Sequence, residues 1–469
     1  MQTKKASFLC LIPLLFLLIS LAFNLHYFGD EAAEGANQLS LILAGLLTSF
    51  LGVYALKMNY QKIEKKALAS IGASLQAIFI LLTVGALIAV WILCGIVPTM
   101  LYWGLSLLSF TFFLPLCCLI CSISSLLTGS SWSTGGTIGV ALIGTGGALG
   151  IPLEIVAGAV ISGAYFGDKL SPLSDTTNLA SGISQVALFD HISNMLKTTL
   201  PSFILSLILF LIIGLNYQSQ MSSADEINQL MLNMQENYTI SSWLFLIPLL
   251  VILAISQKAS ALPALWLGVL SASIIALFQV EPQILIETIC LGHQSQTGLE
   301  SVDSLLSRGG MSNMLTTIWL ILSATYFGGT LEATGFLTQI SYFFLSLVRG
   351  AKSLISSTVF CGFLLNLTTS DQYLAIILSA KLFKNAYRDG RYHYRYLSRS
   401  VEDSATATSV LIPWNTCGAY FSSVLGVSTL SYLPFCFFNL FSPASSLFAS
   451  QWVKPLSEKS GQNQGHSIG

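Results

Sequence analysis

Charged residues are scarce in this sequence of 469 residues. Only 9% of the residues are Asp, Glu, Lys or Arg, whereas 54% are hydrophobic. Soluble globular chains are about one quarter charged. A chain of this length with so little charge cannot cover a surface that faces water, which excludes a soluble globular protein. Lipid is the solvent that fits this composition, so membrane lipid is an expected partner.

The sequence also lacks the patterns that indicate an enzyme, a disulfide framework or a bound cofactor. Its nine cysteines lie mostly inside apolar runs, and the close pair Cys118 and Cys121 has no second pair or histidine nearby. Such cysteines are predicted to be packing residues. The Gly-rich run 144–147 is not followed by the Gly-Lys-Ser/Thr of a phosphate-binding loop. We therefore predict no enzyme activity and no cofactor.

What the chain does contain is a series of apolar segments long enough to cross a bilayer. With a hydrocarbon core of about 30 Å, they predict an all-α polytopic membrane protein of about ten to twelve transmembrane helices. Two of the segments are broken by polar or Gly-rich residues. The segments lie at 8–27, 38–56, 71–93, 107–127, 136–166 (broken), 198–215, 241–256, 261–279, 314–333, 336–348, 353–380 and 409–448 (broken).

Charges in the loops predict the orientation. Lysines crowd the segment 57–66, and lysines and arginines crowd 381–399, so both segments are expected in the cytoplasm. The acidic segments 29–37 and 216–240 contain no Lys or Arg and are expected outside. Because hydrophobic helices flank the basic loops, topology explains them better than a nucleic-acid partner. The apolar run that follows Lys4 and Lys5 is expected to stay in place as the first helix of a multi-pass protein of the bacterial inner membrane.

A weak internal repeat divides the chain. Thr134 precedes Asp168 as Thr369 precedes Asp403, and 369 − 134 and 403 − 168 both equal 235. The expected units are 1–235 and 236–455, followed by a short polar tail, 456–469. The first unit begins on the cytoplasmic side and the second in an external loop, which predicts inverted repeats with broken or re-entrant segments, as in many secondary transporters. Chance similarity between two apolar stretches is the alternative.

Polar residues interrupt the first unit between Gly167 and Ala180. Pro172 removes a backbone donor, and each charged residue here costs about 2.5–3.5 kcal/mol at mid-membrane. Irregular backbone at that depth must line a cavity or be buried in protein. Na⁺ is a hard cation that prefers oxygen ligands. The candidate ligands in this run are Asp168, Ser171, Ser174, Asp175, Thr176 and Asn178.

The second unit contains a matching set of polar residues at 368–371 and 402–418. Its candidate ligands are Thr369, Asp371, Asp403, Asn415 and Thr416. Paired oxygen-rich helix breaks, one in each unit, indicate a transport site. The residues expected to bind sodium directly are Asp175, Ser174, Thr176, Asn415 and Thr416. An exposed loop rich in Ser and Thr is the alternative for either run.

At these blocks the sequence resembles the NhaC family of sodium/proton antiporters. The resemblance rests on residues 127–132 (LTGSSW), 162–180 (SGAYFGDKLSPLSDTTNLA), 371–374 (DQYL), 411–420 (LIPWNTCGAY) and 97–100 (VPTM), and it extends from about residue 70 to 450. Ala405 and Ala407 depart from the expected family pattern. The resemblance implies inverted repeats with re-entrant hairpins. It also implies Na⁺ and H⁺ as partners, although some members move small organic acids or other nutrients.

These observations predict a secondary active transporter. We expect alternating access to one site, where Asp175, helped by Asp168 and by oxygens of the second break, binds either Na⁺ or H⁺. The alternative is a transporter that couples Na⁺ or H⁺ to a small organic acid (malate-like or lactate-like) or an amino acid, with Trp132 and Trp414 shaping the organic site. Assembly as a homodimer stays open.

Overall fold

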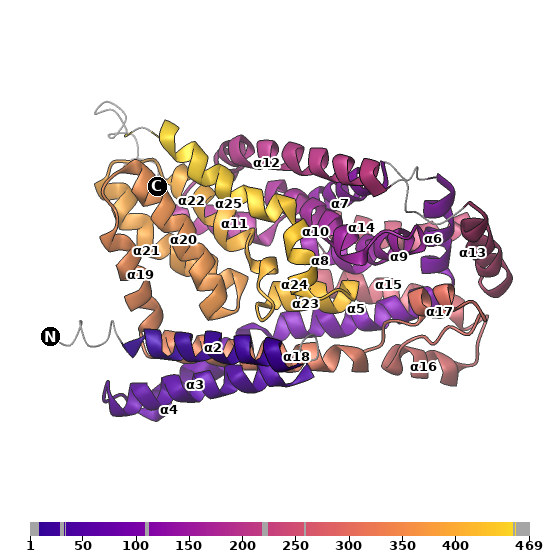
Figure 1. Ribbon diagram of the computed structural model, residues 1–469, viewed down its shortest axis with the longest axis horizontal. Coiled ribbons are helices and arrows are strands. Elements are labelled where there is room, and N and C mark those ends of the chain that lie inside the picture. Colours follow the sequence, from indigo (N-terminus) through magenta and orange to yellow (C-terminus); the bar gives the residue numbers. More distant parts are fainter. Residues whose placement is uncertain are drawn as a thin grey trace.

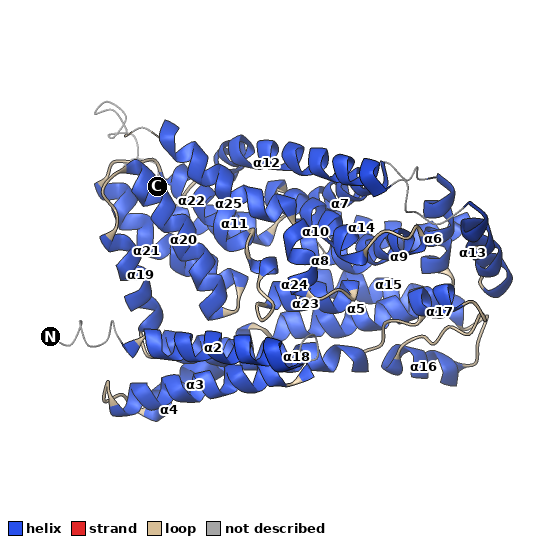
Figure 2. Cartoon of the chain, in the orientation of Figure 1, coloured by secondary structure: helices blue, strands red, loops and turns tan. Residues whose placement is uncertain are grey.

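Helices and their connecting loops make up the whole described part of the chain. The structure, a computed structural model, describes residues 9–28, 32, 34–107, 112–217, 224–257, 259–453 and 455, and these contain no strand (Figures 1 and 2). The all-α prediction is therefore confirmed. The predicted tail 456–469 and the N-terminal residues Lys4 and Lys5 lie outside the described residues.

Among the described residues, six helical segments are long and apolar enough to cross a membrane. They are Leu11–Phe28 (α2), Ala36–Tyr54 (α3), Tyr60–Leu93 (α4, Tyr60–Ala73, and α5, Leu75–Leu93), Leu188–Leu215 (in α12, Leu188–Tyr217), Ser312–Ala333 (ending in α18, Leu315–Ala333) and Ala351–Thr369 (α20). Two bent pairs raise the number to eight, Asn228–Asn237 with Ser242–Ser256 (87°) and Thr429–Phe435 with Phe437–Trp452 (58°). The protein is thus a multi-pass membrane protein, as predicted, and several further predicted passes fold, in the part of the chain that the structure describes, as apolar helices of 10–17 residues.

Shorter and broken helices complete the fold. In the first half they are α6 (Ile96–Leu107), α7 (Phe113–Thr128), α8 (Ser131–Thr134), α9 (Val140–Ala148), α10 (Leu153–Leu170), α11 (Asp175–Ser184) and α13 (Ala224–Asn237). In the second half they are α14 (Leu246–Ser256), α15 (Ala261–Ala276), α16 (Pro282–Leu291), α17 (Glu300–Leu306), α19 (Phe336–Ser346), α21 (Gln372–Asp389), α22 (Tyr394–Val401), α23 (Thr416–Leu425), α24 (Thr429–Tyr432) and α25 (Phe437–Ala449).

The basic segments gather at one end of the molecule. Figure 1 places the start of α4 and the connection from α21 to α22 toward the same end, and α13 at the opposite end. Lys66 Nζ lies 3.0 Å from Glu332 Oε1, which ties the C-terminal end of α18 to the basic end. This separation is the one that the loop charges require. Which end faces the cytoplasm stays a prediction.

The segment 353–380, predicted as one continuous pass, is broken. Helix α20 ends at Thr369, Ser370 adopts a left-handed conformation (φ 58°), and α21 begins at Gln372. Asp371 caps α21, because its carboxylate accepts a hydrogen bond of 2.8 Å from the backbone N–H of Leu374. Two polar residues are enough to end a helix here, since one takes the left-handed position and the other satisfies the new N-terminus.

The helix breaks recur at a fixed spacing. Ser130 caps α8, after left-handed Gly129, and Ser174 caps α11. In the second half Asp371 and Asn415 are the matching caps. The spacing is the same for both pairs, since 371 − 130 and 415 − 174 both equal 241. This register differs by six residues from the spacing of 235 that aligned Asp168 with Asp403. The inverted orientation of the halves stays a prediction.

Helices α7 and α10 are in close backbone contact. A methyl group added at Gly163 would overlap the carbonyl oxygen of Cys118, and one added at Gly167 would overlap that of Ser122. Glycines spaced four apart let two membrane helices approach this closely. The contact fixes the end of α10, and with it Asp168, against the end of α7 and the start of α8.

Candidate ion-binding site

The four helix breaks surround a cavity of about 110 Å³. It touches residues 73–80, near the middle of the 34-residue span Tyr60–Leu93. Polar side chains from the two halves line it together. The lining residues are Ala73, Ser74, Gln76, Ala77, Ile80, Ser130, Ser131, Trp132, Asp168, Asp175, Thr176, Ala261, Asp371, Gln372, Tyr373, Thr416 and Cys417.

Four helices begin at this cavity, and each has a protein side chain as its cap. Ser130 Oγ accepts a hydrogen bond of 3.1 Å from Ser133 N, and Asn415 Oδ1 accepts one of 3.1 Å from Cys417 N. Ser174 and Asp371 cap α11 and α21 in the same way. Such caps satisfy the N–H groups that a helix start leaves free, so the backbone can be broken at membrane depth.

Asp168 is the buried carboxylate of the cavity, with an exposed fraction of 4%. Its Oδ2 accepts hydrogen bonds from Ser131 N (3.1 Å) and from Ser131 Oγ (2.7 Å). Its Oδ1 is buried and has no regular hydrogen bond among the described residues, although the hydroxyl of Ser174 lies near enough to interact with the carboxylate. One oxygen is therefore held in place by α8, while the other is free to take a proton or a cation.

Asp175 lies at the exposed mouth of the same cavity. Its Oδ2 accepts a hydrogen bond of 2.5 Å from the hydroxyl of Tyr373, which belongs to the second half. Its Oδ1 accepts one of 2.9 Å from the backbone N–H of Thr176. Asp175 and Asp168 are close enough for their charges to interact. The cavity thus contains two neighbouring carboxylates, Asp175 at its exposed mouth and Asp168 buried inside it.

Five of the eleven residues predicted from the sequence line this cavity: Asp168, Asp175, Thr176, Asp371 and Thr416. Five others lie at the helix breaks, where their side chains bond to the backbone. Ser174 and Asn415 are caps, and the remaining three donate hydrogen bonds to carbonyl oxygens. These are Ser171 to Leu126 (2.8 Å), Asn178 to Pro172 (2.9 Å) and Thr369 to Leu365 (2.9 Å).

Asp403 does not line the cavity but forms a buried ion pair with Lys169. Thr198 Oγ1 donates to the same carboxylate at 3.2 Å, and Arg399 Nε lies 3.8 Å from its second oxygen. Lys169 Nζ also donates to Ser442 Oγ at 2.6 Å. The partners of this carboxylate thus come from helices of both halves of the chain. Asp403 therefore joins the two halves of the chain through its ion pair with Lys169.

Glu402 is a buried carboxylate that the sequence analysis did not select. It lies in a π-helical stretch, Glu402–Thr406, and is 0% exposed. Neither oxygen has a regular hydrogen bond among the described residues, although the hydroxyls of Thr176 and Thr406 lie near enough to interact. Thr176 lines the cavity, so Glu402 lies directly behind the cavity wall. π-helical turns are frequent at functional sites, but no sequence signal marks them.

We predict that Glu402→Gln leaves the fold intact, with a change in unfolding free energy of about 1 kcal/mol or less. Glutamine has the same shape, and the oxygens that it replaces have no regular hydrogen bond to lose. Thermal unfolding of the purified protein in detergent measures the effect. The matched control is the neighbouring change Asp403→Asn, which removes the charge that balances Lys169. Equal destabilisation by the two substitutions would contradict the prediction.

Comparison with known proteins agrees with these features. The profile of the Na⁺/H⁺ antiporter family matches residues 163–449. The chain is 40% identical to the Na⁺/H⁺ antiporter NhaC of Alkalihalophilus pseudofirmus, over 86% of this chain and 87% of that protein. It is 36% identical to the NhaC of Bacillus subtilis (83% and 86%) and 38% identical to the malate-2H⁺/Na⁺-lactate antiporter of B. subtilis (85% of each). The resemblance found in the sequence is confirmed: this chain belongs to the Na⁺/H⁺ antiporter family.

Proposed function

We propose that this protein exchanges Na⁺ for H⁺ across the bacterial inner membrane, with the cavity at the four helix breaks as its ion site. The observation that carries this proposal is the charge of the cavity wall. Asp168, Asp175 and Asp371 line it, and the described lining residues include no Lys, Arg or His. A small cavity with three carboxylates attracts a cation and repels an anion.

The helix N-termini at the cavity do not reverse this preference. A helix N-terminus attracts anions, with a partial charge of about half an elementary charge. Here the protein supplies the acceptors itself. Asp168 accepts from Ser131 N, Asp371 from Leu374 N and Asn415 from Cys417 N. These N–H groups are therefore not available to a carboxylate substrate.

Exchange follows from competition for the same oxygen. A carboxylate oxygen binds either a proton or a sodium ion, and a cation close to it favours the ionised form. The Oδ1 atom of Asp168 is the proposed binding atom for either H⁺ or Na⁺. Thr176 and Thr416 supply neutral oxygens from the two halves, and Asp175 supplies the charge at the mouth. Because burial favours Asp168 over Asp175, the proposed exchange carboxylate moves from the residue preferred on the sequence to its buried neighbour.

Proteoliposomes with a pH-sensitive dye in their lumen test the proposal. A Na⁺ pulse outside liposomes that contain the purified protein should release protons from the lumen, whereas a K⁺ pulse and protein-free liposomes give the baseline. No Na⁺-dependent signal from well-inserted protein would contradict the proposal.

The relative from B. subtilis that bears the name of a malate-2H⁺/Na⁺-lactate antiporter supplies the competing function. The same liposomes therefore receive L-malate, L-lactate and a set of amino acids, each with and without Na⁺. Our proposal predicts that the Na⁺ signal is complete without any of them. A signal that requires an organic acid or an amino acid would establish the alternative.

A further inference from the structure

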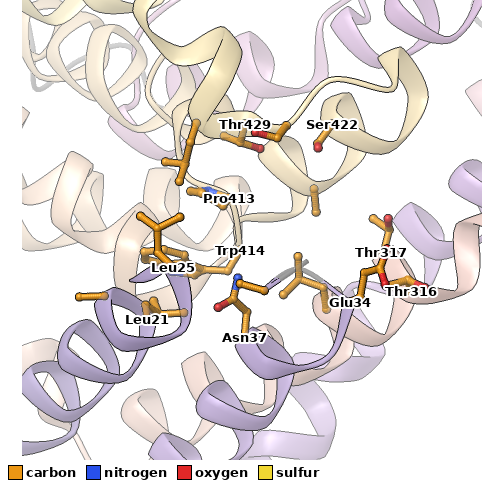
Figure 3. A pocket seen from close by; sticks show the side chains of 16 residues that line it. Leu21, Leu25, Glu34, Asn37, Thr316, Thr317, Pro413, Trp414, Ser422 and Thr429 are labelled. Carbon is orange, nitrogen blue, oxygen red and sulfur yellow. The ribbon is translucent and has the colours of Figure 1, made fainter. Parts of the chain in front are cut away.

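A second and larger cavity, of about 400 Å³, lies on the other side of the break at 412–415. Figure 3 shows its walls, with side chains from the first two membrane helices on one side and Pro413 and Trp414 on the other. Its described lining residues are Leu21, Ala22, Leu25, Ala32, Glu34, Asn37, Thr316, Thr317, Leu320, Pro413, Trp414, Ala419, Ser422, Ser428, Thr429 and Leu430. None of the residues predicted as ion ligands lines it.

The two cavities share one short segment as their common wall. Pro413 and Trp414 line the larger cavity, whereas Thr416 and Cys417, two residues further on, line the ion-binding cavity. Helix α23 continues the wall, with Ala419 and Ser422 on the larger cavity. We propose that the larger cavity is the outer vestibule for a monovalent inorganic cation, separated from the ion-binding cavity by Trp414 and its neighbours; this proposal rests on the proposed exchange function.

The position of the larger cavity assigns it to the predicted external side. Thr316 and Thr317 lie at the start of α18, whose other end is tied to the basic segment by the Lys66–Glu332 pair. The start of α18 is about 22 Å from that end, at 1.5 Å per residue over the 15 residues between Thr317 and Glu332. The ion-binding cavity instead reaches Ala261, at the start of α15. The two cavities therefore have no described lining residue in common, and the segment 413–417 stands between them.

Apolar side chains make up most of the lining of the larger cavity, and the few charged and polar groups among them favour a cation over an anion. Glu34 is its only charged lining residue among those described, and Asn37, Ser422 and Thr429 add neutral polar groups. No described basic side chain faces it, so an anion finds no partner there. An acidic group at the mouth of a low-dielectric cleft raises the local concentration of cations.

Aromatic side chains close the wall. Trp414 Nε1 donates a hydrogen bond of 2.9 Å to the carbonyl oxygen of Leu367, which precedes the break between α20 and α21. Tyr420 stacks on Trp132 at 4.2 Å between ring centroids, and its hydroxyl donates to the Trp132 carbonyl at 2.7 Å. Trp132 lines the ion-binding cavity. A layer of rings from both halves thus stands between the two cavities, and an ion can pass only when these side chains move.

Cysteine accessibility tests the vestibule without any measurement of transport. In a cysteine-free full-length background, Ser422→Cys reports on the larger cavity and Ala77→Cys on the ion-binding cavity. The reagents are a trimethylammonium and a sulfonate methanethiosulfonate, neither of which crosses membranes. We expect the cationic reagent to label Ser422→Cys from the external face of right-side-out vesicles about ten-fold faster than the anionic one, relative to free thiol. Ala77→Cys should react only in everted vesicles.

Two further variants complete the test. Glu34→Gln should bring the ratio of the two labelling rates at Ser422→Cys close to the ratio for a free thiol. Trp414→Ala should make Ala77→Cys accessible from outside, while Trp319→Ala, on the nearby but exposed face of α18, should not. Labelling of Ser422→Cys from the inner face only, an absence of labelling from either face, or preference for the anionic reagent would overturn the vestibule. Because these rates do not depend on transport, they can support the vestibule even if Na⁺-driven proton movement is absent.

Discussion

Asp168→Asn should abolish Na⁺-driven proton release, with a loss of at least about 100-fold in initial rate. Asparagine keeps the hydrogen bonds from Ser131 N and Oγ, since its amide oxygen can replace Oδ2. It cannot bind a proton at neutral pH, nor offer a charge to Na⁺. The measurement is the dye signal in proteoliposomes after a Na⁺ pulse, normalised to the amount of inserted protein.

The matched control for this change is Asp175→Asn, at the mouth of the same cavity. Asp175 is exposed and shares its carboxylate with the hydroxyl of Tyr373. We expect this variant to exchange at high Na⁺ concentration but with a raised half-saturation constant for Na⁺. If Asp168→Asn exchanged like the wild type and Asp175→Asn were inactive, the exchange carboxylate would be Asp175, as the sequence alone indicated.

Lys169→Met should destabilise the folded protein by about 3–5 kcal/mol. The ammonium group is buried, with 1% of its side chain exposed, and it is the partner of the fully buried Asp403. Its removal leaves that carboxylate with only Arg399 at 3.8 Å and hydroxyl donors. The expected result is a large fall in thermal unfolding temperature and in the yield of monodisperse protein.

The double variant Lys169→Met with Asp403→Leu distinguishes two causes of lost stability: an unpaired buried charge and a lost side-chain contact. Because it removes both charges of the pair, it should recover part of the stability that either single change removes, while Arg399 still lacks its carboxylate partner. Lys66→Met is the control at an exposed ion pair, where the Lys66 side chain is 51% exposed, and should cost about 0–1 kcal/mol. Additive losses in the double variant would show that Lys169 and Asp403 do not act as a pair.

The sequence was sufficient for the class of fold, and it selected five of the residues that line the proposed ion-binding cavity. The scarcity of charge indicates a membrane protein. The polar run after Gly167 indicates a helix break, whatever the arrangement of the other helices. Two caps of the second half, Asp371 and Asn415, were also among the predicted residues, because short polar side chains in an apolar run have few other uses. The end of α20 was missed, since Ser370 and Asp371 interrupt hydrophobicity too briefly to show in a window as long as a span.

Long-range contacts explain the remaining differences. The ion pair of Lys169 with Asp403 joins residues 234 positions apart, so the sequence could not show that Asp403 already has a partner. For the same reason the sequence could not show that Asp168 is buried and Asp175 exposed, because burial depends on helices from both halves. Glu402 was overlooked because its neighbourhood depends on a π-helical turn and on Thr176 from the other half.

The close contact of α7 with α10 has a consequence for how substitution data on this protein should be understood. At Gly163 and Gly167 every other amino acid would place a side chain onto a carbonyl of the facing helix. In a complete library of single substitutions selected for growth on sodium, these two glycines would therefore be as intolerant as Asp168, although no ion touches them. Intolerance to substitution alone would therefore assign too many residues to the transport site. Only variants that fold but do not exchange ions identify the residues that belong to it.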